Sequence, residues 1–315
     1  MTSPPEAAPS QPRYVALDAL RGGALGAMLL YHLSWDLANF GYIDTQFPSI
    51  FGMRLFSHLI AATFLAIAGF SLGLAHAQAI RWRAFFKRFF IIAGAALLVT
   101  AATYLSAPGE AIFFGVLHCI AAATLVSALL LRAPAAASLA LAGLFFLSPT
   151  LIAEPSLNDP TIMWLGLGNL EPQSLDWRPL LPWGGFLFLG LGLAQLDRQR
   201  VVLRAAARWR PGPFGQGLAV VGRHTLALYL VHQPIFFAIF MALAQLSASS
   251  PSYQSACAKQ CENTGAPASR CASVCACIEK TVGSAGRNPK EAQSPGAREE
   301  RRNLAAIIQA CAKAP

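Results

Sequence analysis

The sequence predicts an all-α integral membrane protein, a bundle of about seven transmembrane helices followed by a small cysteine-rich helical tail. Of its 315 residues, 55% are hydrophobic and only 12% are charged, whereas soluble domains carry about 25% charged residues. The hydrophobic residues form long runs, and most of the cysteines follow the last run. The net charge of +9 comes largely from basic residues at the ends of these runs. That distribution is typical of membrane topology and argues against nucleic-acid binding.

Seven apolar runs are candidates for membrane-spanning helices, which need about 20 mostly apolar residues each. They are 17–39, 55–76, 89–105, 112–131, 136–152, 180–196 and 218–246. The third, fifth and sixth are short, and the seventh is long enough to tilt or bend. We therefore expect three parts, namely a disordered cytoplasmic N-terminus at 1–13, a transmembrane domain at 14–246 and a periplasmic tail at 247–315.

The basic residues predict the orientation of the chain. They concentrate in the connections at 81–88 and 198–210, and Arg132 follows the fourth run. With seven helices and a cytoplasmic N-terminus, all three groups fall on one side, as the positive-inside rule requires. The pattern therefore predicts a multi-pass protein of the bacterial inner-membrane type, with its C-terminus in the periplasm.

The tail carries six of the seven cysteines. Four of them form two Cys-x3-Cys units separated by nine residues, and they are Cys257, Cys261, Cys271 and Cys275. Residues four apart share one face of a helix, so two such helices in an antiparallel hairpin allow two disulfides. Disulfides require an oxidising compartment such as the periplasm. The spacing matches zinc ribbons poorly, so we expect no metal, but six cysteines allow 15 connectivities.

Several ionisable residues lie inside the apolar runs, where they are costly and usually line a site. His32 and Asp36 share a helical face in the first run, and His118 and His232 are expected at a similar depth near the outer surface. Imidazole can act as nucleophile, general base or proton relay near neutral pH, and Asp36 is placed to orient His32. These four residues are the candidate catalytic group. A structural hydrogen-bond network is the other interpretation, and His58 is expected to be interfacial.

A second group lies near the predicted inner surface. It combines arginines and glycines, which let guanidinium groups and backbone approach a phosphate. The candidate cofactor-binding residues are Asp18, Arg21, Gly22, Arg223 and His224. The alternative is interfacial anchoring by the arginines, with helix packing through the glycines.

Several sequence motifs resemble one known family, the heparan-alpha-glucosaminide N-acetyltransferase catalytic-domain family, and most closely its uncharacterised bacterial members. The motifs are LDALRG at 17–22, YHLSWD at 31–36, FGVLHCI at 114–120, LPWGG at 181–185, GRHTL at 222–226 and HQP at 232–234. The resemblance covers residues 13–246 and omits the tail. It implies a membrane acetyltransferase that takes acetyl from cytosolic acetyl-CoA and delivers it across the membrane. The family's catalytic histidine would fall near Pro48, where this sequence has none.

The favoured function is therefore a membrane-bound acyltransferase. It would move an acetyl or other acyl group from cytoplasmic acyl-CoA to a periplasmic envelope glycan or lipid head group, with acetyl-CoA as co-substrate. The lipid bilayer and the acceptor are the expected partners, and a homo-oligomer is left open. Two other functions are weighed beside it: a proton-coupled transporter that uses the polar stripe of the first helix, and a non-catalytic membrane scaffold with a disulfide-stapled tail.

Overall fold

The computed structural model describes residues 14–197, 201–246 and 265–283, together with the pairs 257–258, 261–262 and 310–311. The chain divides into two compact units, Met1–Ala238 and Ile239–Pro315. The described residues are helical with no strand, which confirms the predicted all-α class. Each unit is considered separately below.

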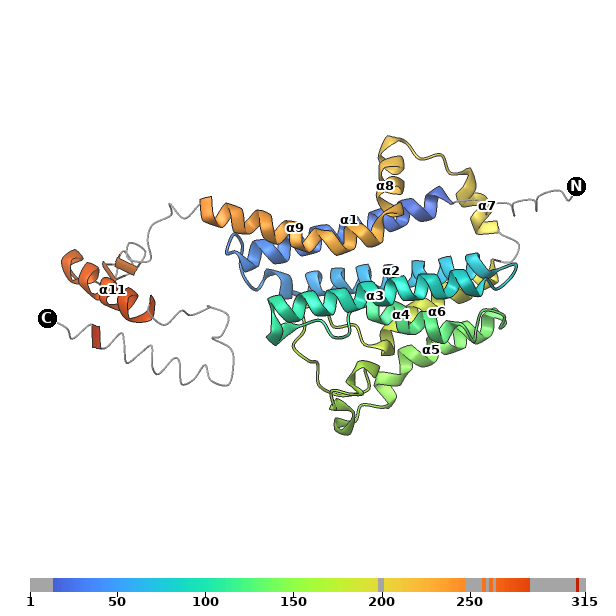
Figure 1. Cartoon of the computed structure of the whole chain (residues 1–315), viewed down its shortest axis with the longest axis horizontal. Helices are drawn as coiled ribbons and strands as arrows, with labels where there is room; N and C mark the ends of the chain where they lie inside the picture. The colour runs from blue at the N-terminus through green and yellow to red at the C-terminus, as the bar shows by residue number, and fades with distance from the viewer. Residues whose placement is uncertain are drawn as a thin grey trace, which may run out of the picture. The chain divides into compact units, whose positions relative to one another are not determined.

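The first unit is a helical bundle (Figure 1). Its helices are α1 (Val15–Asn39), α2 (Phe51–His76), α3 (Trp82–Ser106), α4 (Val116–Ser127), α5 (Ala135–Leu151), α6 (Leu180–Leu196), α7 (Val201–Arg208), α8 (Pro213–Arg223) and α9 (Thr225–Leu246), the last of which continues past the unit boundary. Short 3-10 turns lie in the connections, at Phe47–Ser49, Pro108–Glu110, Pro155–Asn158 and Met163–Leu165. The long connection between α5 and α6 folds back on the bundle through the backbone bonds Leu175 N–H to Glu110 O (2.9 Å) and Arg178 N–H to Phe114 O (3.1 Å).

The helices agree only in part with the seven predicted spans. Among the described residues, α2, α3 and α9 are long and apolar enough to cross a membrane, whereas α4, α5 and α6 are shorter apolar helices. The run at 218–246 was predicted as one helix, but it is divided into α8 and α9 at His224. At this break the Thr225 hydroxyl donates to the Gly222 carbonyl (2.7 Å). Such side-chain bonds to the backbone compete with the regular helical ladder.

Glycines bring pairs of helices into close backbone contact. A Cβ atom at Gly22 of α1 would collide with the backbone of Leu218 in α8, and one at Gly222 would collide with the backbone of Asp18. In the same way Gly69 of α2 abuts the backbone of Leu187 in α6. Small residues at such crossings are typical of helix packing in membranes, where van der Waals contact replaces the hydrophobic effect. These contacts hold α1 against α8 and α2 against α6.

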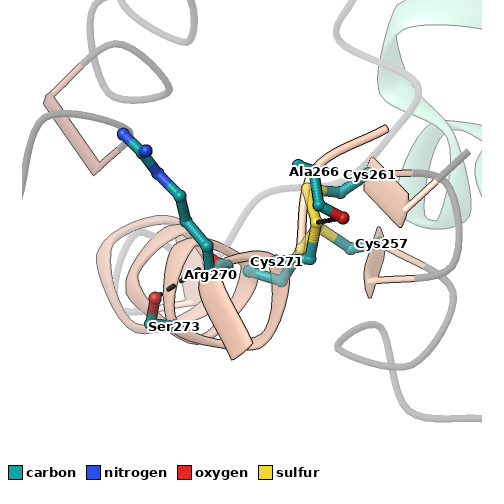
Figure 2. The surroundings of a disulfide bond; sticks show 7 residues. Cys257, Cys261, Ala266, Arg270, Cys271 and Ser273 are labelled. Carbon is teal, nitrogen blue, oxygen red and sulfur yellow. Dashed lines mark hydrogen bonds between the residues drawn. A yellow bond between two sulfur atoms is a disulfide. The ribbon is translucent and has the colours of Figure 1, made fainter. Parts of the chain in front are cut away.

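The second unit contains α11 (Ala268–Gly283), which carries three of the tail cysteines. Three sulfur pairs are at bonding distance, Cys257 with Cys275, Cys261 with Cys271, and Cys277 with Cys311. Figure 2 shows Cys257 and Cys261 approaching α11 beside Cys271. The first two pairs are nested, which is the arrangement that an antiparallel pair of Cys-x3-Cys units allows. Cys271 and Cys275 are fully buried, so sulfur atoms form much of this unit's small interior.

Candidate functional site

A cavity of about 390 Å³ lies among the helices of the bundle. Its lining comes from α1, α2, α3, α4 and α9 and is mostly aliphatic or aromatic. The apolar lining residues are Phe64, Ile67, Ala68, Ala84, Ile91, Ile92, Val116, Leu117, Ile120, Leu226 and Tyr229, with Thr225 beside them. We call this the donor cavity. Its composition suits a ligand whose greater part is uncharged.

The donor cavity also carries three cationic side chains, Arg21 of α1 and Lys87 and Arg88 of α3. Arg21 and Arg88 line the same cavity from different helices, so it holds like charges from α1 and α3. Among the described residues, no acidic side chain forms an ion pair with Lys87 or Arg88. A cluster of like charges on an apolar cavity is electrostatically unfavourable until an anion binds to it. The cavity therefore matches a ligand with an anionic end and an apolar arm.

Arg21 is held in place by its neighbours on two helices. Its guanidinium donates to Asp18 Oδ1 (2.8 Å) and to the hydroxyl of Ser71 in α2. Asp18, whose residue surface is only 3% exposed, also lies 3.6 Å from Nε of Arg223. One buried carboxylate thus orients two arginines from helices far apart in the sequence. Arg21 faces the donor cavity, and Arg223 does not line it.

The inner group predicted from the sequence therefore separates into different roles. Arg21 lines the donor cavity, and Asp18 positions it. Gly22 lets α1 and α8 pack closely where they cross. His224 is exposed at the break before α9. Lys87 and Arg88 were not among the predicted ligand-binding residues, because the positive-inside rule already accounts for basic residues at 81–88. Their position one turn inside an apolar helix was the signal that was available.

A second group of polar residues joins α1 to α9. The rings of His32 and His232 lie with their centroids 4.8 Å apart. Asp36 is 1% exposed, and its Oδ1 accepts a hydrogen bond from Gln233 Nε2 (2.9 Å). Nδ1 of His232 lies 2.7 Å from the Tyr229 carbonyl, and Tyr229 lines the donor cavity. The fold thus brings together three of the four predicted catalytic residues.

His232 has an unused ring nitrogen in a buried position. The residue is 8% exposed, and its Nε2 is a buried atom with no hydrogen-bond partner among the described residues. The bond between Nδ1 and the Tyr229 carbonyl requires a proton on Nδ1. In the neutral ring Nε2 is then an acceptor, so it is the atom available to take a proton.

His118, the fourth predicted catalytic residue, has a different environment. Its Nδ1 accepts from the backbone N–H of Gly115 (3.2 Å), and its Nε2 lies 3.1 Å from the hydroxyl of Thr100. That hydroxyl donates to the carbonyl of Ile112 (2.6 Å). Both ring nitrogens are thus used to fasten the start of α4. No contact among the described residues joins His118 to His32 or His232.

A second cavity, of about 380 Å³, is lined by polar and aromatic side chains. We call it the polar cavity. Its lining residues are Arg54, His58, Met163, Gly166, Gly168, Asn169, Leu170, Glu171, Trp177, Arg178 and Trp183. Most of them come from the connection between α5 and α6, which the sequence did not single out. His58 packs edge-on against Trp183 (5.2 Å between ring centroids).

Arg178 and Asp176 connect the surroundings of the two cavities. Arg178 lines the polar cavity, bonds to Ser57 (2.6 Å) and lies over the ring of Trp183 (4.8 Å). Asp176 Oδ2 accepts from the backbone N–H of Val116 (2.8 Å), and Val116 lines the donor cavity. The two side chains lie 3.8 Å apart. The Asp176–Arg178 ion pair therefore links Val116 of the donor cavity to the polar cavity.

The fold is that of a helical membrane protein, and its bundle holds an apolar cavity with three cationic side chains and a separate polar cavity. The family model of the heparan-alpha-glucosaminide N-acetyltransferase catalytic domain matches residues 13–234, and the chain belongs to this family. The match spans all the residues of both cavities and confirms the resemblance drawn from the motifs. Comparison with curated proteins and with solved structures gave no significant match. The described residues contain no group of three or more side chains suited to hold a metal ion.

Proposed function

We propose that this protein is a membrane acyltransferase that takes an acetyl group from acetyl-CoA bound in the donor cavity. The observation that carries the proposal is the combination of an apolar cavity with Arg21, Lys87 and Arg88. Guanidinium groups suit phosphate oxygens, and CoA joins a phosphorylated nucleotide to a long, uncharged pantetheine arm. Family membership supports the same class of reaction.

In this proposal the cationic residues bind the phosphates of CoA, and the pantetheine arm follows the apolar lining toward Val116 and Tyr229. Asp18 keeps Arg21 extended toward the cavity through the 2.8 Å bond. The thioester then lies close to the ion pair of Asp176 and Arg178. CoA requires no metal for this chemistry, which a proton acceptor and a polarising group can perform.

The polar cavity is the proposed place of the acceptor, an envelope glycan or a lipid head group. The lone pair of an acceptor amine or hydroxyl attacks the thioester carbonyl, and the carbon–sulfur bond breaks as the new bond forms. The acceptor proton passes to Nε2 of His232, which then gives it to the departing CoA thiolate and returns to its neutral form. We assign the proton transfer to His232 with His32 beside it, because both nitrogens of His118 already have partners.

The bond between Asp36 and Gln233 holds α1 and α9 together at this point. A carboxylate close to the histidine pair also stabilises the imidazolium that forms when His232 takes a proton. We propose that Asp36 acts in this way without touching the substrates.

The topology and the tail belong to the same proposal. We propose seven crossings, with the N-terminus in the cytoplasm and the tail in the periplasm, where its cysteines are oxidised. The basic connections at 81–88 and 198–210 and the sulfur pairs support this arrangement. An alkaline phosphatase fusion after Ser247 is expected to be active. An inactive fusion at this point, together with an inactive one after Ala107, would reverse the orientation.

The decisive experiment measures acetyl-CoA binding and acetyl transfer with the purified full-length protein in nanodiscs. Calorimetric titration is expected to show saturable binding of acetyl-CoA, and radiolabelled acetyl is expected to appear in envelope glycan or lipid fractions. Mass spectrometry of the envelope from a deletion strain then identifies the acceptor by its missing acetyl groups. If acetyl-CoA does not bind, the acyltransferase proposal fails. Proton uptake into vesicles without acetyl-CoA binding would support a transporter instead.

A further inference from the structure

The segment that begins with α7 has the features of a membrane-surface element. The region 198–210 contains five arginines, and no acidic residue occurs anywhere in 198–261. Topology alone requires positive charge in this connection but does not require a folded helix. The structure nevertheless forms α7 at Val201–Arg208, and the following residues lead into α8.

Basic and apolar side chains are exposed together on this segment. Arg204 and Arg208 are four residues apart on one helical face, and both are exposed, as is Arg210. Trp209 is 46% exposed, and Phe214 at the start of α8 is 82% exposed. Among the described residues, none of these arginines forms an ion pair. Exposed arginines beside exposed aromatic rings are characteristic of helices that lie in the headgroup region of a bilayer.

The location of the segment supports the same conclusion. α7 lies at the end of the bundle where α1 begins and where α2 connects to α3 (Figure 1). That connection is also basic, with Arg81 and Arg83 beside Trp82, whose side chain is exposed as well. One end of the bundle therefore presents exposed cations and aromatic rings from two separate connections.

We propose that the segment formed by α7, Trp209, Arg210 and Phe214 is a binding site for anionic phospholipid headgroups. The arginines contact lipid phosphates, while Trp209 and Phe214 enter the boundary between headgroups and acyl chains. Charge complementarity favours an anionic lipid over a zwitterionic one, because the segment has no acidic side chain to pair with a choline or ethanolamine group. This site is separate from the donor cavity and does not depend on the acyltransferase proposal.

The test titrates dioctanoyl phosphatidylglycerol and dioctanoyl phosphatidylcholine into the detergent-solubilised full-length protein, with binding followed by native mass spectrometry. The variant is the triple substitution R204Q/R208Q/R210Q. The matched control is Arg132→Gln, an exposed arginine in the connection between α4 and α5. Because each arginine near an anionic surface contributes about 1 kcal/mol, the triple variant should bind phosphatidylglycerol roughly 150-fold more weakly.

The expected result is a preference of the wild type for phosphatidylglycerol that weakens at high salt, is lost in the triple variant and is kept in the control. Phosphatidylcholine binding should be unchanged in all three proteins. Trp209→Ala should weaken binding of both lipids, because it removes the apolar anchor and leaves the charge. The proposal is overturned if the triple variant keeps the preference, or if Arg132→Gln loses it to the same extent. Circular dichroism of each variant checks that the helices remain folded.

Discussion

His118 and His232 both lie on apolar helices, but they differ in how their ring nitrogens are used. His118 connects a backbone N–H to a threonine hydroxyl, so both of its nitrogens have partners. Nδ1 of His232 donates to a backbone carbonyl, while its buried Nε2 has no hydrogen-bond partner in the part of the chain that the structure describes. A buried polar atom without a partner costs about 1–3 kcal/mol, so it is retained only where something else requires it. The comparison indicates that His118 stabilises the start of α4, while His232 is available for chemistry.

The basic residues near the inner end show the same contrast. Arg223 lies beside Asp18 at 3.6 Å, outside the donor cavity. Arg88 lines the cavity and has no acidic partner among the described residues. Arg223, which already has an acidic partner, contributes to the packing of the bundle. Arg88, which has none among the described residues, is the better candidate for binding an anionic ligand. The predictions below test this difference, beginning with the largest expected effect.

The strongest test compares His232→Ala with His118→Ala. Removing a general base lowers the rate by about 100- to 10,000-fold, so His232→Ala should lose nearly all acetyl transfer while its affinity for acetyl-CoA stays within about twofold. His118→Ala should instead lower stability by about 1–3 kcal/mol and keep its activity per folded molecule. Radiolabelled acetyl transfer and thermal unfolding in detergent measure the two effects. Equal loss of activity at both positions would place His118 in the chemistry.

Arg88→Ala and Arg223→Ala test the cationic end of the donor cavity. Hydrogen bonds to charged groups contribute about 1.5–3 kcal/mol, so Arg88→Ala should raise the Kd for acetyl-CoA by about 10- to 150-fold. Arg223→Ala should change this Kd by less than about threefold, which corresponds to well under 1 kcal/mol. Calorimetric titration provides both values. A larger effect at Arg223 would mean that CoA binds on the far side of Asp18.

Gly69→Ala and Gly94→Ala apply the comparison to helix packing. A Cβ at Gly69 would collide with the backbone of Leu187, whereas a Cβ at Gly94 meets nothing within 4 Å. Overpacking costs about 1–3 kcal/mol, so Gly69→Ala should lower the unfolding temperature in detergent. Gly94→Ala should leave it unchanged or raise it, since alanine favours a helix over glycine by about 1 kcal/mol. If the two variants had equal unfolding temperatures, α2 and α6 would pack less closely at Gly69 than the structure shows.

The smallest effect on activity is expected in the tail. With the pairs of the structure oxidised, alkylation of the denatured protein without reductant should label none of the six tail cysteines. Cys277→Ser should expose one new thiol, because it removes the partner of Cys311. Mass spectrometry of the labelled peptides counts the thiols, and acetyl transfer should be unaffected. Labelling of all six cysteines in the wild type would show that the tail is reduced.

Much of the fold was predictable because its causes are local in the sequence. Apolar runs of sufficient length fix the all-α class, whereas the cysteine spacing in the tail left 15 connectivities open. The breaks are harder to predict, since the division at His224 depends on one hydroxyl bond from Thr225 to Gly222. The start of α4 is likewise held by side-chain acceptors, because the backbone N–H groups of Gly115 and Val116 donate to His118 and Asp176.

The sequence by itself determined that this is a helical membrane protein of the heparan-alpha-glucosaminide N-acetyltransferase catalytic-domain family, because hydropathy and motifs are properties of neighbouring residues. It also identified His32, Asp36 and His232 as unusual, since ionisable groups are costly in an apolar helix. Only the tertiary structure decided which of these groups meet. Asp36 and Gln233 are 197 residues apart in sequence, and no periodicity reveals such a contact. The same holds for Arg88 and Arg178, whose roles depend on helix packing around the two cavities.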